Sequence, residues 1–298
     1  MRLASNPHLR HVWLGNSTLN ADAARALAGI RSLRSVVLDS SMSADDCRVL
    51  VEARPDLAVY HESIQASTET QAAVDWVLAN KGTLTAYGAP APVDSSPQGP
   101  FLALTLDFPV DSPPSSGWEH LPALGGLQQF YCMHAVEHAD DLAAQVAKLD
   151  SLSNVGMNAE SLTAKGLSQL AALPHLEILA LSHCSEALTA EAWSAFRGKR
   201  LLRWVNLDGV LSDAALAEIA ACPQLEVLTI SGVRGITAAG LRPLANCRWL
   251  TEIHLENTDL DDDGLEPLAK IRSLRLLFLD GTRVTPQGLA RLHTALPH

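Results

Sequence analysis

An apolar pattern of the form Leu-x-x-Leu-x-Leu recurs along most of the chain. Its clearest copies run from Leu250 to Leu255 and from Leu274 to Leu279, and successive starts between Leu152 and Leu274 lie 23 to 26 residues apart. Apolar residues that alternate with other residues predict a short β-strand with one buried face. The eleven copies begin at Leu9, Leu33, Leu57, Phe101, Leu127, Leu152, Leu176, Leu202, Leu225, Leu250 and Leu274.

A second pattern, with helical spacing, follows these strands. Leu265, Leu268 and Ile271 recur at steps of three after one strand, and residues 236–247 repeat the arrangement after the strand before it. Each such segment predicts a short helix. A unit of one strand and one helix, about 24 residues long, buries its apolar face only by stacking on its neighbours. The sequence therefore predicts one α/β solenoid over residues 1–298, with a parallel sheet on the inside of a curve and helices outside.

The strand segments and the trailing segments such as Ile236-Thr-Ala-Ala-Gly-Leu241 resemble the leucine-rich repeat family. The resemblance is to its ribonuclease-inhibitor-like and F-box-associated, cysteine-containing subclasses, and it is strong over residues 9–60 and 150–298. It implies a horseshoe of about eleven repeats, with a concave parallel β-sheet and convex helices, whose usual role is to bind other proteins. It also implies that Cys222 and Cys247 occupy core positions just before a strand.

The repeat becomes irregular in residues 85–117, where two stretches rich in Pro, Ser and Gly interrupt it. Residues 101–108 between them predict a buried strand, residues 69–80 before them predict a helix, and residues 84–87 are a candidate for an extra strand. Long insertions in solenoids either contact partners or are neutral surface excursions. Both interpretations stay open.

Both ends of the sequence fall at repeat boundaries, and no separate capping module is expected. Open solenoid ends expose apolar surface. Either the terminal units are polar enough alone, or the ends meet another chain by self-association or otherwise. The pattern does not fix an oligomeric state.

Strand alternation also predicts which side chains line the concave face, namely the third, fifth and seventh residues of each copy. These positions hold several aromatic residues, six carboxylates including Asp39 and Asp107, and no Lys or Arg. Exposed aromatic side chains are frequent binding anchors, and acidic groups steer a basic partner. In the alternative interpretation, the Asp side chains bond to turn amides and the aromatic rings pack on cross-strand neighbours. The candidate partner-binding residues are Trp13, Tyr131, Trp204, Asp208, Glu252, His254, Glu256, Phe278 and Asp280.

Composition and charge argue against two classes of protein, nucleic-acid binders and membrane-spanning proteins. The chain has 33 Asp and Glu against 22 Lys and Arg, a net charge of -11, which argues against nucleic acid as a partner. No apolar window is long enough to span a membrane, and no signal peptide is evident, so a cytoplasmic location is expected, with secretion by a route that needs no cleavable signal left open. The five cysteines are widely spaced and predict buried free thiols.

The chain carries no recognised catalytic or phosphate-binding motif, and we expect neither an enzyme nor a cofactor. Asp261, Asp262 and Asp263 are interpreted as helix N-terminal carboxylates rather than a metal site. Cys132, His134 and His138 do not match a zinc spacing, so no metal is expected.

The predicted function is a non-enzymatic module that binds a basic protein on its acidic, aromatic concave face. In a narrower version it is an inhibitor or immunity protein that occludes a basic toxin or nuclease. The alternative is an adaptor or host-directed bacterial effector that selects a target protein.

Overall fold

The computed structural model describes residues 9–15, 20–38, 43–54, 57–61, 64–87, 92–95, 97, 99, 101–108 and 114–296. The chain divides into two compact units. The first comprises Met1–Phe130 with Lys148–Leu152, and the second comprises Tyr131–Ala147 with Ser153–His298.

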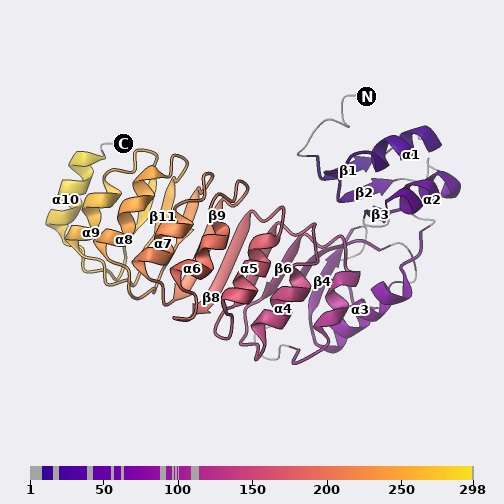
Figure 1. Ribbon diagram of the computed structural model, residues 1–298, viewed down its shortest axis with the longest axis horizontal. Helices are drawn as coiled ribbons and strands as arrows, with labels where there is room; N and C mark the ends of the chain where they lie inside the picture. The colour runs from indigo at the N-terminus through magenta and orange to yellow at the C-terminus, as the bar shows by residue number, and fades with distance from the viewer. Residues whose placement is uncertain are drawn as a thin grey trace. The chain divides into compact units, whose positions relative to one another are not determined.

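The second unit alternates short strands with short helices. Its strands pair in parallel and in chain order, and Figure 1 shows them side by side in the part of the ribbon coloured from pink to yellow. They are β7 (Asn154–Asn158), β8 (Ile178–Cys184), β9 (Trp204–Gly209), β10 (Val227–Thr229), β11 (Glu252–His254) and β12 (Leu276–Phe278). A further strand, β6 (Gln129–Cys132), crosses the boundary between the units along the sequence.

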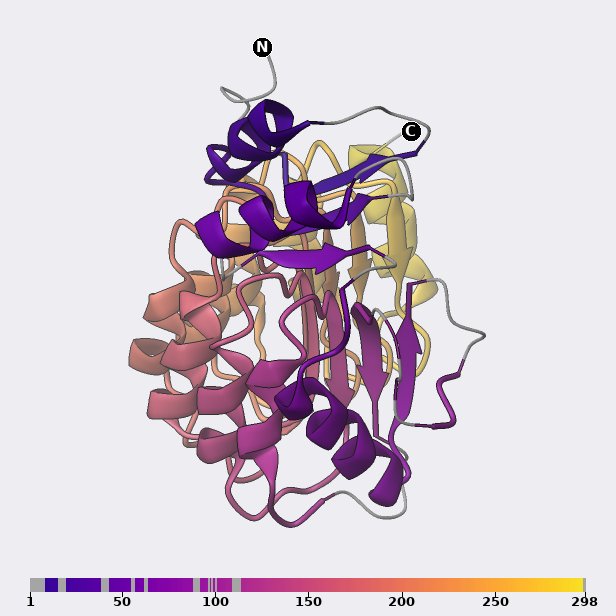
Figure 2. The same cartoon turned by 90° about the vertical axis from the view of Figure 1, so that its right-hand side faces the viewer.

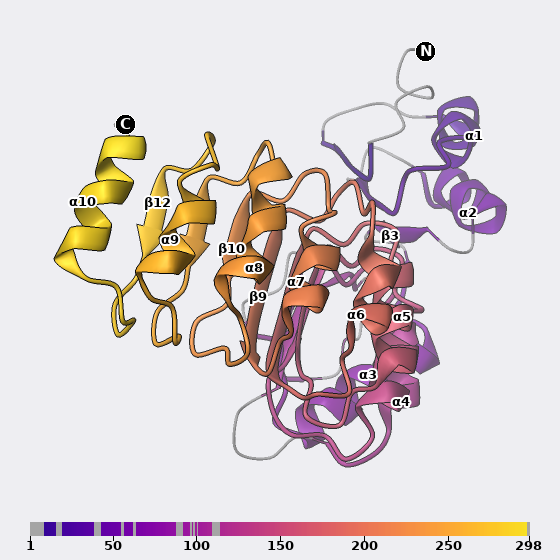
Figure 3. The same ribbon diagram turned by 60° about the vertical axis from the view of Figure 1, so that its left-hand side comes forward.

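The helices of the second unit form one layer on one side of these strands, as Figure 3 shows for α5 to α10. This arrangement confirms the predicted fold class, an α/β solenoid. The helical elements are α4 (Ala139–Val146), α5 (Ala164–Ala172), α6 (Ala190–Trp193), η2 (Ser194–Phe196), α7 (Asp213–Ile219), α8 (Ala238–Leu241), η3 (Arg242–Asn246), α9 (Asp262–Leu268) and α10 (Pro286–Ala295).

The core of the second unit is a ladder of aliphatic side chains. From the copy at Leu152 to the copy at Leu250 the fourth and sixth residues are buried, as Leu228 with Ile230 and Ile253 with Leu255 illustrate, whereas Leu277 and Leu279 of the last copy are half-buried. Helix leucines such as Leu216 and Leu265 are buried as well, but Leu289 of α10 is exposed. The alternation that predicted this face is confirmed. Each buried side chain of this size contributes about 1.5–3 kcal/mol relative to exposure, so the ladder is the main source of stability.

Two cysteines at the helix ends join consecutive repeats. The thiol of Cys222 donates to the carbonyl of Phe196 at 3.4 Å, and the thiol of Cys247 donates to the carbonyl of Ala220 at 3.2 Å. The prediction that both lie in the core is confirmed. Burial raises the pKa of Cys222 to about 12 and that of Cys247 to about 11, which keeps both as thiols.

A second link between repeats joins an Asp at the start of one helix to a Thr at the start of the next. The Asp213 carboxylate accepts from the amide and the hydroxyl of Thr237 at 2.8 and 2.5 Å. A Cβ on Gly240, three residues later, would lie 2.1 Å from Asp213 Oδ1, so this approach requires glycine. The same contacts join Asp140 to Thr163 with Gly166, and Asp262 to Thr285 with Gly288.

Several helices of the second unit begin at a polar N-cap residue. Thr237 and Thr285 each cap their own helix while also bonding the preceding Asp. Asp261 is the N-cap of α9, where its side chain accepts from the amide of Asp263. This confirms that Asp261–Asp263 supply helix N-terminal carboxylates.

The first unit begins with three parallel strands and two helices, which Figure 2 shows in indigo and dark purple. It continues with a helix, an antiparallel strand pair and a 3-10 turn. The elements are β1 (His11–Leu14), α1 (Ala21–Ala28), β2 (Ser35–Leu38), α2 (Ala44–Ala53), β3 (Ala58–Tyr60), α3 (Thr68–Ala79), β4 (Thr83–Ala86), β5 (Ala103–Asp107) and η1 (Trp118–Ala123).

The antiparallel pair is the main departure from the predicted architecture. The helix at 69–80, the strand at 101–108 and the extra strand near 84–87 are all confirmed, but β4 pairs antiparallel with β5. The long segment between β4 and β5 allows the chain to reverse, whereas a regular repeat forces a parallel crossover. The expectation of a wholly parallel sheet is therefore wrong at this point.

The described part of the chain was compared with two further expectations, on membrane-spanning helices and on cysteines. No helix there is long and apolar enough to cross a bilayer. Its five cysteines are free and buried, as predicted.

Candidate partner-binding face

The sheet of the second unit turns one side toward the helices and the other away from them. We call the side away from the helices, over four strands, the β9–β12 face. It consists of the third, fifth and seventh residues of four copies: Trp204, Asn206, Asp208, Val227, Thr229, Ser231, Glu252, His254, Glu256, Leu276, Phe278 and Asp280.

Three large apolar side chains on this face are exposed to solvent. Trp204 is 42% exposed, Leu276 is 50% exposed and Phe278 is 37% exposed. Trp204, Val227, Glu252 and Leu276 are register partners on successive strands and form one row across the sheet. The sequence analysis placed Leu276 on this face but did not count it among the binding residues. The signal that could have identified it is a large apolar residue at the third position of the copy that begins at Leu274.

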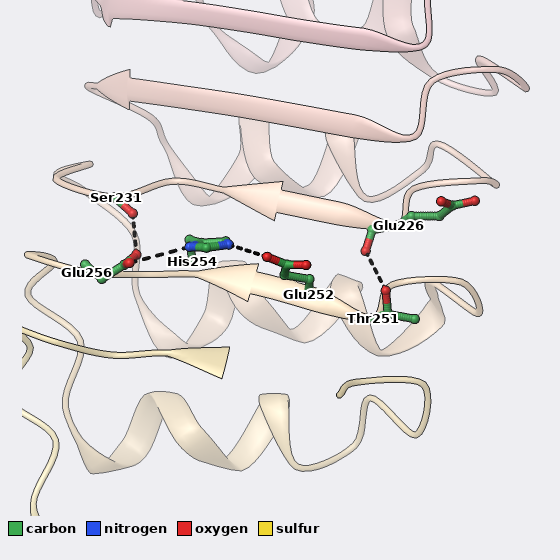
Figure 4. A network of polar contacts seen from close by, with 6 residues as sticks. All are labelled: Glu226, Ser231, Thr251, Glu252, His254 and Glu256. Atoms are coloured by element: carbon green, nitrogen blue, oxygen red, sulfur yellow. Dashed lines mark hydrogen bonds and ion pairs between the residues drawn. The ribbon is translucent and has the colours of Figure 1, made fainter. Parts of the chain in front are cut away.

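His254 lies at the centre of a small polar network, drawn in Figure 4. Its Nε2 is 2.7 Å from Glu252 Oε1, and its Nδ1 is 3.5 Å from Glu256 Oε1. Because a carboxylate only accepts, the short contact places the imidazole proton on Nε2. The imidazole also stacks on Phe278, with ring centroids 4.2 Å apart and planes 9° apart. The structure therefore brings together four predicted residues.

Glu256 is ionised in this network. Its second oxygen accepts from the hydroxyl of Ser231 at 2.6 Å, and this bond is the main cause that lowers the pKa of Glu256 from its usual value. By register, Asp280 on the next segment lies opposite Glu256, and the amide of Asn257 donates to the Asp280 carbonyl at 2.8 Å. Asp280 itself is exposed. Two carboxylates thus lie side by side at this end of the face.

Asp208 has a structural role besides its place on the face. One of its oxygens accepts from the backbone amide of His183 at 2.6 Å, and His183 has a left-handed φ of 56°. The carboxylate therefore fixes a strained turn at the end of β8, as the alternative interpretation of these Asp residues expects.

Tyr131 is half-buried and lies against a backbone rather than among the other anchors. A Cβ on Gly156 would be 2.6 Å from Tyr131 Cδ1, so the ring covers a strand position that has no side chain. The signal for this packing was the glycine at a predicted face position. Tyr131 is therefore a weaker candidate for partner contact than Trp204.

Trp13 belongs to the first unit. It is 72% exposed, and its ring meets that of Tyr87 edge to face at a centroid distance of 6.2 Å. Tyr87 also meets Tyr60 at 4.8 Å. Trp13 is thus an exposed aromatic residue beside two tyrosines.

Several predicted face positions are buried, which corrects the surface prediction. Ser35, Val37 and His61 of the first unit are covered, as are Asn158 and Ser182 of the second. Packed side chains cover both sides of β2, a possibility that strand alternation alone does not address. Asp39 lies outside the described residues, and Asp107 is exposed at the end of β5.

Lys and Arg are missing from the β9–β12 face and occur at its rim. Arg203 pairs with Glu226 at 3.1 Å, and Arg283 pairs with Asp259 at 2.6 Å. No Lys or Arg from within the face therefore neutralises the charge of Glu252, Glu256 and Asp280.

The described residues hold no cluster of three or more His, Cys, Asp or Glu side chains arranged to bind a metal ion. His254 and its two glutamates bond to one another rather than around a common centre. What the arrangement offers is a partly apolar, negatively charged surface.

A sequence profile described as a leucine-rich repeat matches residues 246–269, which contain β11 and α9. The same strand-and-helix unit recurs through the second unit. Residues 246–269 are thus a leucine-rich repeat. Proteins with such repeats are generally non-enzymatic interaction scaffolds. The subclass suggested by the sequence stays a prediction. No curated protein matches the chain.

Solved structures similar to this chain include an internalin, InlF, from Listeria monocytogenes. That likeness has 14% identity and a TM-score of 0.45, and it covers 97% of this chain and 67% of the other. A TLR13–ssRNA13 complex is similar with 18% identity and a TM-score of 0.43, over 95% of this chain and 37% of that one. Internalin C2 from the same bacterium has 15% identity and a TM-score of 0.41, over 72% and 94%.

Proposed function

We propose that this protein is a non-enzymatic protein-binding module whose β9–β12 face docks a partner with a basic surface. The observation that carries the proposal is the combination on one face of three exposed apolar side chains, Trp204, Leu276 and Phe278, with carboxylates that have no Lys or Arg on that face.

The three exposed apolar side chains lower the stability of the free protein. A large apolar side chain on a solvent-facing sheet gives up the free energy that burial would supply, about 1.5–3 kcal/mol each. Such residues on a face with polar neighbours mark interaction sites. Tryptophan is also enriched among residues that dominate binding energy. Docking a partner on the β9–β12 face recovers the burial of all three side chains.

The negative charge of the face determines which kind of partner it favours. The chain carries a net charge of -11, and the face adds Glu252, Glu256 and Asp280 without a Lys or Arg. Such a surface accelerates encounter with a basic protein and repels acidic ones. It therefore favours a basic protein partner.

The test is affinity capture from the native cell with three proteins in parallel. They are the wild type, the Trp204→Ala/Phe278→Ala variant and the control Trp249→Ala. Trp249 is 56% exposed but precedes β11 and lies outside the face, so its loss removes an equally accessible tryptophan. Each variant must first match the wild-type melting curve.

We expect one basic protein to be enriched by the wild type and by Trp249→Ala but lost with the double variant. Loss of the same partner with Trp249→Ala alone, or its full retention by the double variant, would show that the β9–β12 face is not the binding surface.

A further inference from the structure

The corner of the β9–β12 face at β12 leaves one aromatic plane open. The ring of Phe278 stacks on His254 with one of its two planes. Because the two residues are register partners on neighbouring strands, the line between the rings runs across the sheet. The second plane of Phe278 therefore faces away from β11. No strand in the described residues pairs with the outer edge of β12, and Phe278 stays 37% exposed.

The same corner carries unbalanced negative charge. Glu256 and Asp280 each lie two residues beyond the last register pair, His254 and Phe278, in adjacent turns that the bond from the Asn257 amide to the Asp280 carbonyl joins, and like charges close together repel each other. Among the described side chains, none donates a hydrogen bond to the Asp280 carboxylate or forms an ion pair with it. The nearby cations are engaged elsewhere, since Arg283 pairs with Asp259 and Arg275 bonds to backbone carbonyls. A cation supplied by a partner relieves this repulsion.

We propose that Phe278, Asp280 and Glu256 form a docking site for an arginine side chain of the protein partner. This inference rests on the proposed function and specifies the chemistry of the contact. The guanidinium stacks on the open plane of Phe278 and directs its N–H groups toward the carboxylates. Asp280 follows Phe278 by two residues, in the turn that succeeds β12, about 7 Å along the chain, within reach of a stacked arginine.

Arginine fits this corner better than lysine for a geometric reason. The guanidinium is planar, stacks on aromatic rings and presents a fork of donors that matches a carboxylate. The lysine ammonium is a compact, strongly hydrated charge that satisfies the carboxylates but does not stack. Leu276 precedes Phe278 by two residues in β12 and is 50% exposed. It adds an apolar contact for the rest of the partner segment.

The test follows the ring signals of Phe278 by NMR in protein labelled at its phenylalanines. The chain contains 5 phenylalanines, and Phe278→Leu assigns the signal. The probes are Nα-acetyl-arginine methylamide and Nα-acetyl-lysine methylamide at equal ionic strength. We expect a saturable shift with the arginine probe and binding at least about threefold weaker with the lysine probe, as an exposed cation–π contact implies.

Asp280→Asn removes the charge with little change of shape, and Glu191→Gln on α6 removes one charge from the helix layer as a control. We expect Asp280→Asn to weaken arginine binding at least about threefold, as the loss of a charge-assisted hydrogen bond implies, and the control to leave it unchanged. Equal binding of the two probes, or arginine binding that survives Asp280→Asn, would overturn the inference.

The two proposals fail in different ways. If the arginine probe fails while the Trp204→Ala/Phe278→Ala variant still loses its partner, the binding face stands and only the arginine site is wrong. If that variant retains its partner, the proposed function is wrong whichever probe binds.

Discussion

The regular repeats of the second unit and the irregular part of the first unit bury their cores with different side chains. From β7 to α9, leucines at fixed spacing fill the space between strand and helix, and Asp–Thr contacts and cysteine thiols join one repeat to the next. Around α3, β4 and β5, three aromatic rings pack together beside buried aliphatic side chains such as Val74, Leu84 and Leu106. Trp76 lies 5.5 Å from both Phe108 and Trp118, and the latter two lie 5.6 Å apart between centroids.

The difference between the two parts shows how a constant repeat length determines the packing of the core. When every unit has nearly the same length, the same small side chain fits at each level and the same polar contact repeats. When insertions change the spacing, the gaps are larger and irregular, and large aromatic side chains fill them. The regular part repeats the same aliphatic contacts from unit to unit, apart from the buried pair Trp193 and Phe196, whereas the irregular part adds a cluster of three aromatic rings.

The largest expected effect is therefore on a single aromatic residue of the irregular part. Phe108→Ala should destabilise the protein by about 3–5 kcal/mol because it leaves a large cavity. Hydrogen exchange should accelerate most in residues 68–86 and 101–124, which contain the elements around this ring. The comparison variant is Leu228→Ala, a fully buried leucine of β10, whose effect should centre on the neighbouring repeats. Unchanged exchange around Phe108 would refute the role of the aromatic core.

A smaller effect is expected when the contact between repeats is disturbed. Gly240→Ala places a Cβ against Asp213 and should cost about 1–3 kcal/mol through overpacking. Denaturant unfolding measures it, with Gly125→Ala as the matched control because no heavy atom lies within 4 Å of a Cβ there.

A double-mutant cycle identifies the cause of the Gly240→Ala effect. In an Asp213→Ala background the clashing carboxylate is gone, so Gly240→Ala should cost less by at least about 0.5 kcal/mol. Strict additivity of the two substitutions would show that Asp213 is not what glycine accommodates.

The same type of contact predicts a pH dependence. Hydrogen bonds from Thr285 lower the pKa of Asp262, with a further contribution from Arg291. A carboxyl with a lowered folded-state pKa stabilises the fold above its unfolded pKa, about 3.9, and loses this contribution as the pH falls through the folded value. The difference in melting temperature between wild type and Asp262→Asn should therefore be largest near neutral pH and shrink below about pH 4. Asp263→Asn, at a neighbouring carboxylate that neither Thr285 nor Arg291 bonds, is the matched control.

The smallest expected effect is on thiol reactivity. Burial raises the pKa of Cys47 and Cys247 to about 11 and that of Cys184 and Cys222 to about 12. Because only the thiolate reacts, the folded protein should resist alkylation at these four sites near pH 8, and all four should react in denaturant. Rapid labelling of Cys222 in the folded protein would contradict its place in the core.

The sequence was sufficient to predict the repeats, their strand starts and the side of each regular strand that faces the core. Leucine spacing determines these features directly. It was not sufficient for the antiparallel pairing of β4 and β5, because an insertion removes the constraint that makes a crossover parallel. Nor did alternation reveal that Ser35 and His61 are covered, since it assigns a side of a strand and says nothing about what lies over it.

For the candidate site, the sequence placed Glu252, His254, Glu256 and Phe278 on one face, but not the hydrogen bonds and stacking that join them. Those depend on rotamers and on register between strands. The Asp–Thr–Gly contacts were missed although a signal exists, namely an Asp at one helix start about 24 residues before a Thr that is followed three residues later by Gly.

The central claim is that the β9–β12 face binds a basic protein, and the most direct measurement is the dissociation constant of the captured partner against the wild type and the Trp204→Ala/Phe278→Ala variant. Each anchor should contribute about 2 kcal/mol or more, so the double variant should bind at least about a hundredfold more weakly, while Trp249→Ala should match the wild type. Binding should also weaken as salt is raised. Equal affinity for the wild type and the double variant would contradict the account.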